Sequence, residues 1–254
     1  MLNALMKRLE KLGSFFVFIG QVFLSIFKPP FRLNQFLNEV ELLGVNSVLI
    51  IMLSSAAIGM IFALQMVSLL EVFQAEIAVG AAVAVSMARE LAPIITSLML
   101  IAKSGSAMTA ELGTMNVTEQ IDALESMAIN PIQYLILPKV LACLLVFPIL
   151  TLLANVVGTV GSYLVSVYLF SIDNAGYIDY MFDFLYPVDI IMGMIKAAIM
   201  GVMVSVICCY FGLHTTQGAK GVGDSATKAV VASSVSILMA DYVLTTVMMP
   251  LIDK

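Results

Sequence analysis

The stretch VLACLLVFPILTLLANVVGTVGSYLVSVYLF, Val140 to Phe170, contains no Asp, Glu, Lys or Arg. A helix needs about 20 apolar residues to cross the hydrocarbon core of a bilayer, and this run is longer. The whole chain has a similar character, because 61% of its residues are hydrophobic and 11% are charged, whereas soluble domains are about 25% charged. The 254 residues are therefore predicted to form one all-α integral membrane domain, without an appended soluble enzyme domain.

Other apolar runs have the length of a spanning helix as well. The five predicted spans are Leu42–Leu70, Ile77–Ala102, Val140–Phe170, Val188–Leu213 and Val230–Ile252. A shorter run, Gly13–Phe27, follows a basic flank and favours a helix that lies along the membrane surface. We expect residues 1–41 to form this interfacial region and residues 42–252 to form the five-span region.

Lys and Arg alternate between the predicted connections. They occur in the N-terminal region, between the second and third spans and between the fourth and fifth, whereas the other two connections carry only acids. The cations of these connections are Lys7, Arg8, Lys11, Lys28, Arg32, Lys103, Lys139, Lys220 and Lys228. Because cytoplasmic loops are enriched in Lys and Arg, we expect a cytoplasmic N-terminus and a periplasmic C-terminus. The absence of a transit-peptide pattern favours a bacterial inner membrane.

One predicted cytoplasmic connection is unusually polar: AELGTMNVTEQIDALESMAINP, Ala110 to Pro131. Asn116 followed by Glu119 has the spacing of a helix N-cap with an acid three residues later. The Asn130–Pro131 pair predicts the end of that helix, because the residue before a proline avoids the α region. The segment is therefore predicted to be a short amphipathic helix, which is either a plain connector or a docking element.

Four charged residues fall at membrane depth: Arg89, Glu90, Lys196 and Asp241. Each costs about 2.5 kcal/mol or more if it faces lipid at the bilayer centre, so we expect all four to face the protein interior or a wet cavity. Arg89 and Glu90 are adjacent and point in different directions on a helix, so they are not expected to pair with each other. A Lys196–Asp241 pair between neighbouring helices is the economical arrangement.

These charges have two interpretations. Internal ion pairs that fix helix packing are favoured for Lys196 and Asp241. A cavity for a phospholipid headgroup is favoured for Arg89 and Glu90, because Pro93 opens the helix nearby and an Arg fork suits a phosphate. Further candidates on the first span are Gln65 as a hydrogen-bonding group and Ile61, Leu64 and Leu69 as an acyl-chain lining or as ordinary lipid-facing surface.

Four motifs carry a resemblance to a known family. They are ARELAP (Ala88–Pro93), SGSAMTAELGTM (Ser104–Met115), TEQIDALESMAINP (Thr118–Pro131) and the pair Asp241–Tyr242. With them the chain resembles the MlaE/YrbE permeases, the membrane subunits of ABC transporters that act on lipids with MCE proteins. The resemblance extends from about Leu42 to the end. The chain departs from the family at two places. Lys103 stands where the family often has Arg, and Glu39 and Glu41 make the segment before the first span more acidic than expected.

The resemblance implies a homodimeric phospholipid permease with an N-terminal elbow helix in each subunit. Cytoplasmic ATPase subunits, which bind ATP and Mg²⁺, would dock on a coupling helix at about residues 111–130, and an MCE-domain protein would lie outside. Nucleic acid is not expected to be a partner. The expected ATPase contacts are Glu111, Met115, Glu119, Gln120, Asp122 and Glu125.

The sequence has no phosphate-binding loop of its own. GAKGVG (Gly218–Gly223) lacks the required spacing and is interpreted as a flexible cytoplasmic loop. We therefore expect no catalytic residue, no cofactor and no metal site in this chain. An ion-coupled secondary transporter that uses Glu90, Lys196 and Asp241 remains the alternative, whereas an intramembrane hydrolase lacks a credible set of catalytic side chains.

Overall fold

The computed structural model describes residues 2–26, 32–216 and 218–252, and within these ranges the chain is helical with no strand. Five helical segments are long and apolar enough to cross a membrane. They are Leu33–Glu71, Glu76–Val117, Ile132–Leu169, Pro187–Leu213 and Gly218–Pro250. A shorter apolar helix, Gly13–Ile26, precedes them. The predicted fold class, five spans with an additional N-terminal helix, is confirmed.

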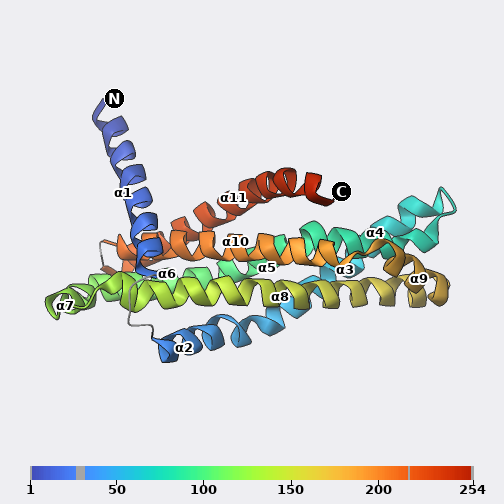
Figure 1. The fold of residues 1–254 in the computed structure, drawn as a ribbon, viewed down its shortest axis with the longest axis horizontal. Coiled ribbons are helices and arrows are strands. Elements are labelled where there is room, and N and C mark those ends of the chain that lie inside the picture. Colours follow the sequence, from blue (N-terminus) through green and yellow to red (C-terminus); the bar gives the residue numbers. More distant parts are fainter. Residues whose placement is uncertain (1, 27–31, 217, 253–254) are drawn as a thin grey trace.

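The spans lie side by side in one elongated bundle (Figure 1). At its centre α8 (Leu137–Leu164) packs against α3 (Val48–Glu71) and α10 (Pro187–Leu213). The last helix, α11 (Gly218–Ile252), packs on α10 and on α6 (Ser106–Val117). Helix α1 (Leu2–Ile26) stands across the bundle axis at one end (Figure 1), which is the direction of a helix that lies in the membrane plane.

Helices α3 and α8 approach closely enough to require glycine. A Cβ on Gly59 would lie 2.0 Å from the carbonyl oxygen of Gly158, and a Cβ on Gly161 would lie 2.8 Å from the carbonyl oxygen of Ala56. Small residues allow such backbone contact between membrane helices, where packing rather than water exclusion drives association. This contact fixes the first span against the third.

Several helices continue beyond the predicted membrane boundaries, because a helix does not end where its residues become polar. The second span passes through two π-helical turns, η3 (Met87–Leu91) and η4 (Ile101–Gly105), and through α5 (Ala92–Leu100) before it reaches α6. The predicted loop at Gly218–Gly223 is wrong, since these residues form the first turns of α11. Gly221 is buried there, and packing offsets the low helix propensity of glycine.

The polar helix of the second connection also differs from the prediction. Asn116 lies inside α6, where its side-chain nitrogen donates to the carbonyl oxygen of Thr215 at 2.9 Å, so it caps no helix. Glu119, in the left-handed conformation, precedes the short helix α7 (Gln120–Ser126). Asn130 accepts a hydrogen bond from the backbone nitrogen of Ile132 at 2.9 Å, so the Asn130–Pro131 pair begins the third span instead of ending α7.

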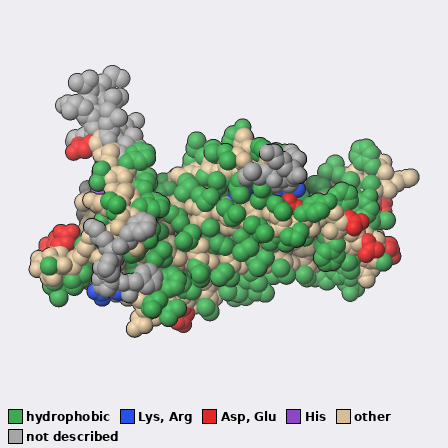
Figure 2. All heavy atoms as spheres, viewed as in Figure 1, with side chains coloured by type: hydrophobic (Ala, Val, Ile, Leu, Met, Phe, Trp, Pro, Cys, Tyr) green, Lys and Arg blue, Asp and Glu red, His purple; other side chains and the backbone are tan. Residues whose placement is uncertain are grey.

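The described Lys and Arg residues of the connections lie at one end of the bundle. Helix α7 lies at the same end as the segments that carry Arg32, Lys103, Lys139, Lys220 and Lys228, and the segments of the opposite end carry Glu71, Glu76, Asp173, Asp179 and Asp183 (Figure 1). Acidic side chains occur at both ends (Figure 2). The alternation between connections thus becomes a difference between two ends. Lys28 and the side chains of Lys7, Arg8 and Lys11, which also carried the orientation prediction, lie outside the described residues.

The acidic end is covered by α9 (Asn174–Phe184), a helix that Asp173 caps by accepting from the backbone nitrogen of Gly176 at 2.8 Å. Tyr177 packs into the bundle, and its hydroxyl lies 3.0 Å from the hydroxyl of Ser162. Burial raises the pKa of the Tyr177 hydroxyl, which therefore stays neutral. This anchor holds α9 across the end of the third span.

Candidate functional site

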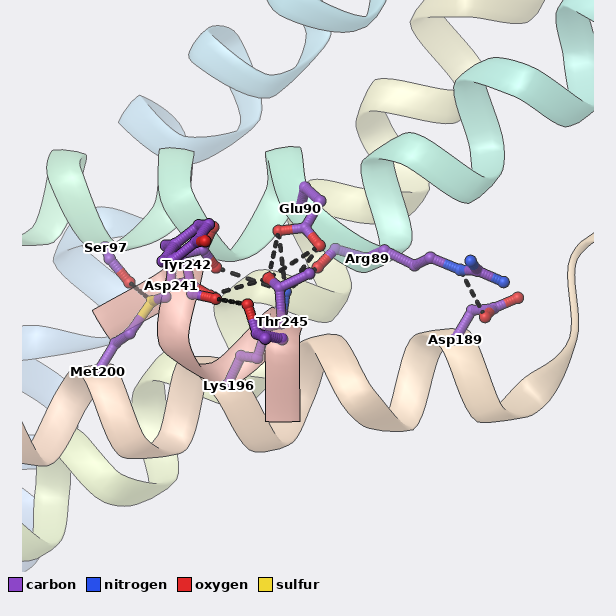
Figure 3. Close-up of polar contacts among 10 residues, drawn as sticks. Arg89, Glu90, Ser97, Asp189, Lys196, Met200, Asp241, Tyr242 and Thr245 are labelled. Atoms are coloured by element: carbon purple, nitrogen blue, oxygen red, sulfur yellow. Dashed lines mark hydrogen bonds and ion pairs between the residues drawn. The ribbon is translucent and has the colours of Figure 1, made fainter. Parts of the chain in front are cut away.

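Lys196 is the centre of a buried polar cluster between three helical segments (Figure 3). Its ammonium nitrogen lies 2.8 Å from both carboxylate oxygens of Glu90 and 3.5 Å from Oδ1 of Asp241. It also donates to the hydroxyl of Thr245 at 2.7 Å. Lys196 and Asp241, the pair predicted from the sequence, thus lie within ion-pair distance, but Glu90 is the closer partner.

The backbone of the second span shapes this cluster. Pro93 has no N–H and cannot donate to the carbonyl of Arg89 one turn earlier, as a helix interior requires. Lys196 supplies a replacement, because its ammonium donates to that carbonyl oxygen at 3.0 Å. The π-helical turn η3 precedes the proline and carries Arg89 and Glu90. The lysine thus binds a side chain and a backbone carbonyl to which Pro93 cannot donate.

A close helix contact brings Lys196 to this position. Gly193, one turn earlier on α10, faces the π-helical turn, and a Cβ there would lie 2.2 Å from the carbonyl oxygen of Ala88. Only glycine permits this approach. The spacing between α10 and the second span is therefore set by a missing side chain.

Helix α11 contributes Thr245 and Asp241. The Thr245 hydroxyl lies 3.1 and 3.2 Å from the two carboxylate oxygens of Glu90 and 2.8 Å from the carbonyl oxygen of Asp241. Oδ1 of Asp241 is buried and has no hydrogen-bond partner within the described chain. The ammonium thus faces two carboxylates. Sequence reasoning missed Thr245, although a threonine four residues after the intramembrane aspartate lies on the same helix face.

Arg89 points away from Lys196, toward the start of α10 (Figure 3). Its Nε donates to Oδ1 of the fully buried Asp189 at 2.8 Å. The other carboxylate oxygen of Asp189 accepts from the backbone nitrogen of Tyr186 at 3.1 Å and so caps α10. As predicted, Arg89 and Glu90 do not pair with each other. Sequence reasoning missed Asp189. Proline is common at the first position of a helix, so Pro187, two residues earlier, could have indicated that Asp189 lies in a first helical turn.

A small cavity of about 90 Å³ joins the two charge groups. Its lining combines three charged side chains with Thr245 and three flexible sulfur-containing ones. These residues are Arg89, Glu90, Met192, Lys196, Thr245, Met248 and Met249. Since a water molecule occupies about 30 Å³ in the liquid, the space within one chain accommodates a few waters and not a lipid.

The other predicted lipid contacts lie elsewhere. Ile61, Leu64, Gln65 and Leu69 are exposed along one face of α3, and none of them lines the cavity beside Arg89 and Glu90. The buried face of α3 uses the intervening positions, among them Ala63 and Val67. The structure of the single chain therefore does not bring the acyl-chain candidates and the charged candidates together.

The predicted docking residues lie at the opposite end from α9. Glu119, Gln120, Asp122 and Glu125 are exposed on and before α7, whereas Met115 is half-buried in α6. Ile121 is buried and holds α7 against the bundle. These four exposed side chains form one accessible polar surface.

Glu111 belongs to a different arrangement. Its Oε2 lies 2.8 Å from the ammonium nitrogen of Lys139, which is 2% exposed at the start of α8. Glu39 on α2 (Leu33–Leu43) binds the same nitrogen at 2.6 Å. The acidic entry at Glu39 thus has a structural role, which is to tie α2 to α6 and α8. Sequence reasoning noticed Glu39 but not its partner.

In the described ranges no group of His, Cys, Asp and Glu side chains is arranged to hold a metal ion. Three cysteines, Cys143, Cys208 and Cys209, are buried free thiols that form no disulfide. The arrangement of charges can therefore bind, orient and separate polar groups.

Comparison with known proteins gives matches over most of the chain. The family model described as "Permease MlaE" matches residues 36–247. A probable ABC transporter permease protein of Rickettsia felis is 36% identical, and the alignment covers 93% of this chain and 91% of that protein. One from a Synechocystis species is 36% identical over 94% of this chain and 91% of that protein.

A plant protein is similar as well. The chloroplastic protein TRIGALACTOSYLDIACYLGLYCEROL 1 of Arabidopsis thaliana is 41% identical over 90% of this chain, which covers 65% of the plant protein. The matched region contains every residue of the charge cluster and of the α7 surface.

Proposed function

Since this chain belongs to the MlaE permease family, we propose that it is the membrane subunit of an ABC transporter that moves phospholipids. A separate ATPase subunit supplies the energy, because the sequence lacks a phosphate-binding loop. The observation that carries the proposal is an acidic helical surface, built around α7, that projects from the cation-rich end of a five-span bundle.

The charge cluster supports an amphiphilic substrate. Within the described chain Arg89 uses only Nε in its bond to Asp189, which leaves the outer donors of the guanidinium for a phosphate. That side chain is 34% exposed next to the small cavity. The Arabidopsis relative is named after trigalactosyldiacylglycerol, a glycolipid, and this name supports a lipid substrate.

The small size of this cavity supports a homodimer. A phospholipid does not fit in about 90 Å³, so the path for its acyl chains requires further surface. The exposed face of α3 with Ile61, Leu64, Gln65 and Leu69 supplies an apolar wall with one polar group. We infer that two copies enclose the lipid between such walls, and that the charged residues hold its headgroup.

The remaining parts of the proposal concern orientation and partners. Glu119, Gln120, Asp122 and Glu125 face the cytoplasm and contact the ATPase, and the acidic end with α9 faces the periplasm, where an MCE-domain protein binds. The bundle spans a bacterial inner membrane. The distribution of Lys and Arg between the two ends supports this orientation.

Reconstitution tests the proposal. The chain is placed in liposomes that contain a fluorescent phospholipid, with and without its ATPase. Lipid movement should require both the ATPase and ATP hydrolysis, and should be lost when Glu119 and Asp122 are changed to Lys. Movement by the chain alone that collapses with the proton gradient would instead establish the ion-coupled alternative, for which Glu90, Lys196 and Asp241 form the candidate relay.

A further inference from the structure

A groove of about 800 Å³ separates α1 from α7. One wall is α1, with Phe18, Gln21, Leu24 and Ser25, and part of the other wall is α7. The end of α10 contributes Leu213 and His214. The rest of the second wall comes from α6, α7 and the connection that follows α7; its residues are Asn116, Ile121, Asp122, Glu125, Ala128, Ile129, Asn130, Pro131 and Ile132. Two segments distant in sequence thus face each other across one opening.

The α1 wall is built into the fold. Phe18 and Val22 are buried in a satellite core with Leu112, Val140 and Cys209. The rings of Phe15 and Phe18 lie 5.1 and 5.7 Å from the ring of Tyr210. Because these contacts fix α1 to the second, third and fourth spans, the groove has a defined width.

The opposite wall is fixed at two points. Ile121 is 6% exposed, and Asn116 holds the carbonyl of Thr215 at the end of α10. Asp122 and Glu125, which follow these anchors in the sequence, are exposed and line the groove. Within the described chain neither carboxylate has an ion-pair partner, and no Lys or Arg is among the described residues of the lining.

This lining selects its occupant by charge. A segment that carries Lys or Arg next to an apolar side chain would satisfy the two carboxylates and cover Leu24 and Leu213. A membrane surface fits less well, because cytoplasmic leaflets are negatively charged and the acidic wall repels them. Arg is the stronger candidate of the two cations, since its planar fork pairs with carboxylates bidentately.

We propose that the groove receives a basic, partly apolar projection of the ATPase subunit, so that α1 forms the second half of the docking surface. This inference rests on the proposed function, in which α7 contacts the ATPase. It adds that docking depends on α1 and on the sign of the charge in the groove.

Two substitutions of opposite charge at one position test this proposal. Gln21 is exposed on α1 and lines the groove, so Gln21→Lys and Gln21→Glu change the charge of the wall without changing the core. The affinity of the ATPase for the full-length chain in nanodiscs is measured for both variants and for Asp122→Lys. Gln21→Lys should weaken binding about tenfold, since a like charge at close range in a partly solvated groove costs about 1.4 kcal/mol, and Gln21→Glu should bind at least as tightly as the wild type.

Each other result is decisive. If Asp122→Lys abolishes binding while both Gln21 variants bind normally, α7 docks the ATPase and the inference about α1 is wrong. Retention of extra anionic lipid by Gln21→Lys, with unchanged ATPase affinity, would assign the groove to the membrane. Equal weakening by Gln21→Lys and Gln21→Glu would also overturn the inference, because it would show that charge sign is irrelevant. Normal binding by Asp122→Lys would remove the proposed docking function itself.

Discussion

At the scale of single residues, Lys196 has more acceptors than protons to donate. Its nitrogen lies within hydrogen-bond distance of Glu90, Thr245 and the carbonyl of Arg89, while Asp241 remains at 3.5 Å. The two carboxylates are therefore not equivalent. Glu90 is the carboxylate that the ammonium binds directly, and Asp241 adds a second carboxylate to the same site.

Removal of the ammonium should be costly, whereas removal of the second negative charge should not be. Lys196→Met leaves Glu90 and Asp241 without a cation and should lower the free energy of unfolding by about 1–3 kcal/mol, a value below that of a fully buried pair because Glu90 is partly exposed. Asp241→Asn leaves one neutral ion pair and should be neutral or stabilising. Thermal unfolding of both variants in detergent measures the difference. Equal destabilisation by the two would show that Asp241 is as strongly paired as Glu90.

Arg89 combines two roles that variants can separate. Arg89→Ala leaves the buried Asp189 unpaired and should destabilise the fold by about 1–3 kcal/mol, a value below that of a fully buried pair because the arginine is partly exposed. The double variant Arg89→Ala/Asp189→Asn should recover stability but not the phospholipid that co-purifies with the chain. Lipid content and unfolding temperature are measured together. Recovery of both would assign Arg89 a purely structural role.

At the scale of elements, the intervals between helices are set by residues that lack side chains. Gly193 lets α10 approach the π-helical turn at Ala88, and this approach delivers Lys196 to Glu90. The same turn is adjacent to Pro93, whose missing N–H leaves the acceptor that Lys196 binds. The position of the charge cluster thus depends on a glycine and a proline that carry no charge.

Gly193→Ala should move α10 away from the second span. The added Cβ would meet the carbonyl oxygen of Ala88 at 2.2 Å, and such overpacking typically costs about 1–3 kcal/mol. Gly223→Ala in α11 is the matched control, because a Cβ there meets nothing within 4 Å; it should be neutral or stabilising by up to about 1 kcal/mol. Unfolding temperature and lipid transport are measured for both. Full transport by Gly193→Ala would disprove the positioning role.

At the scale of the whole molecule, the two ends of the bundle differ in their helices and in their content of Lys and Arg. The α7 end holds the described cations outside the bundle interior, and the α9 end holds acids and exposed aromatic residues such as Phe182 and Tyr186. The two ends therefore present different surfaces, one for the proposed ATPase and one for the proposed periplasmic partner.

Cysteine labelling from the two sides of the membrane checks this orientation. Met127, next to α7, and Asp183, on α9, are exposed, and the native cysteines are buried and should give little background. Met127→Cys should react with an impermeant maleimide only from the cytoplasmic side, and Asp183→Cys only from the periplasmic side. The reverse pattern would contradict the proposed topology.

The number of spans, the position of the polar segment and the alternation of cations followed from the sequence alone. Hydropathy depends on composition over a window of residues, and the charge of a loop depends only on the residues in that loop. Neither property requires knowledge of a distant contact. Internal polar partners for the intramembrane charges followed in the same way, since an unpaired charge in lipid is costly wherever it lies.

The choice of partner for each charge was decided by the tertiary structure. Glu90 rather than Asp241 lies closest to Lys196, Arg89 binds Asp189, and Asn116 holds Thr215 instead of capping a helix. These outcomes depend on how each helix is rotated and how closely its neighbour approaches, and the residues that decide this, such as Gly193, lie on other helices. The groove between α1 and α7 likewise exists only because packing around Tyr210 brings the N-terminal helix to the end of the second span.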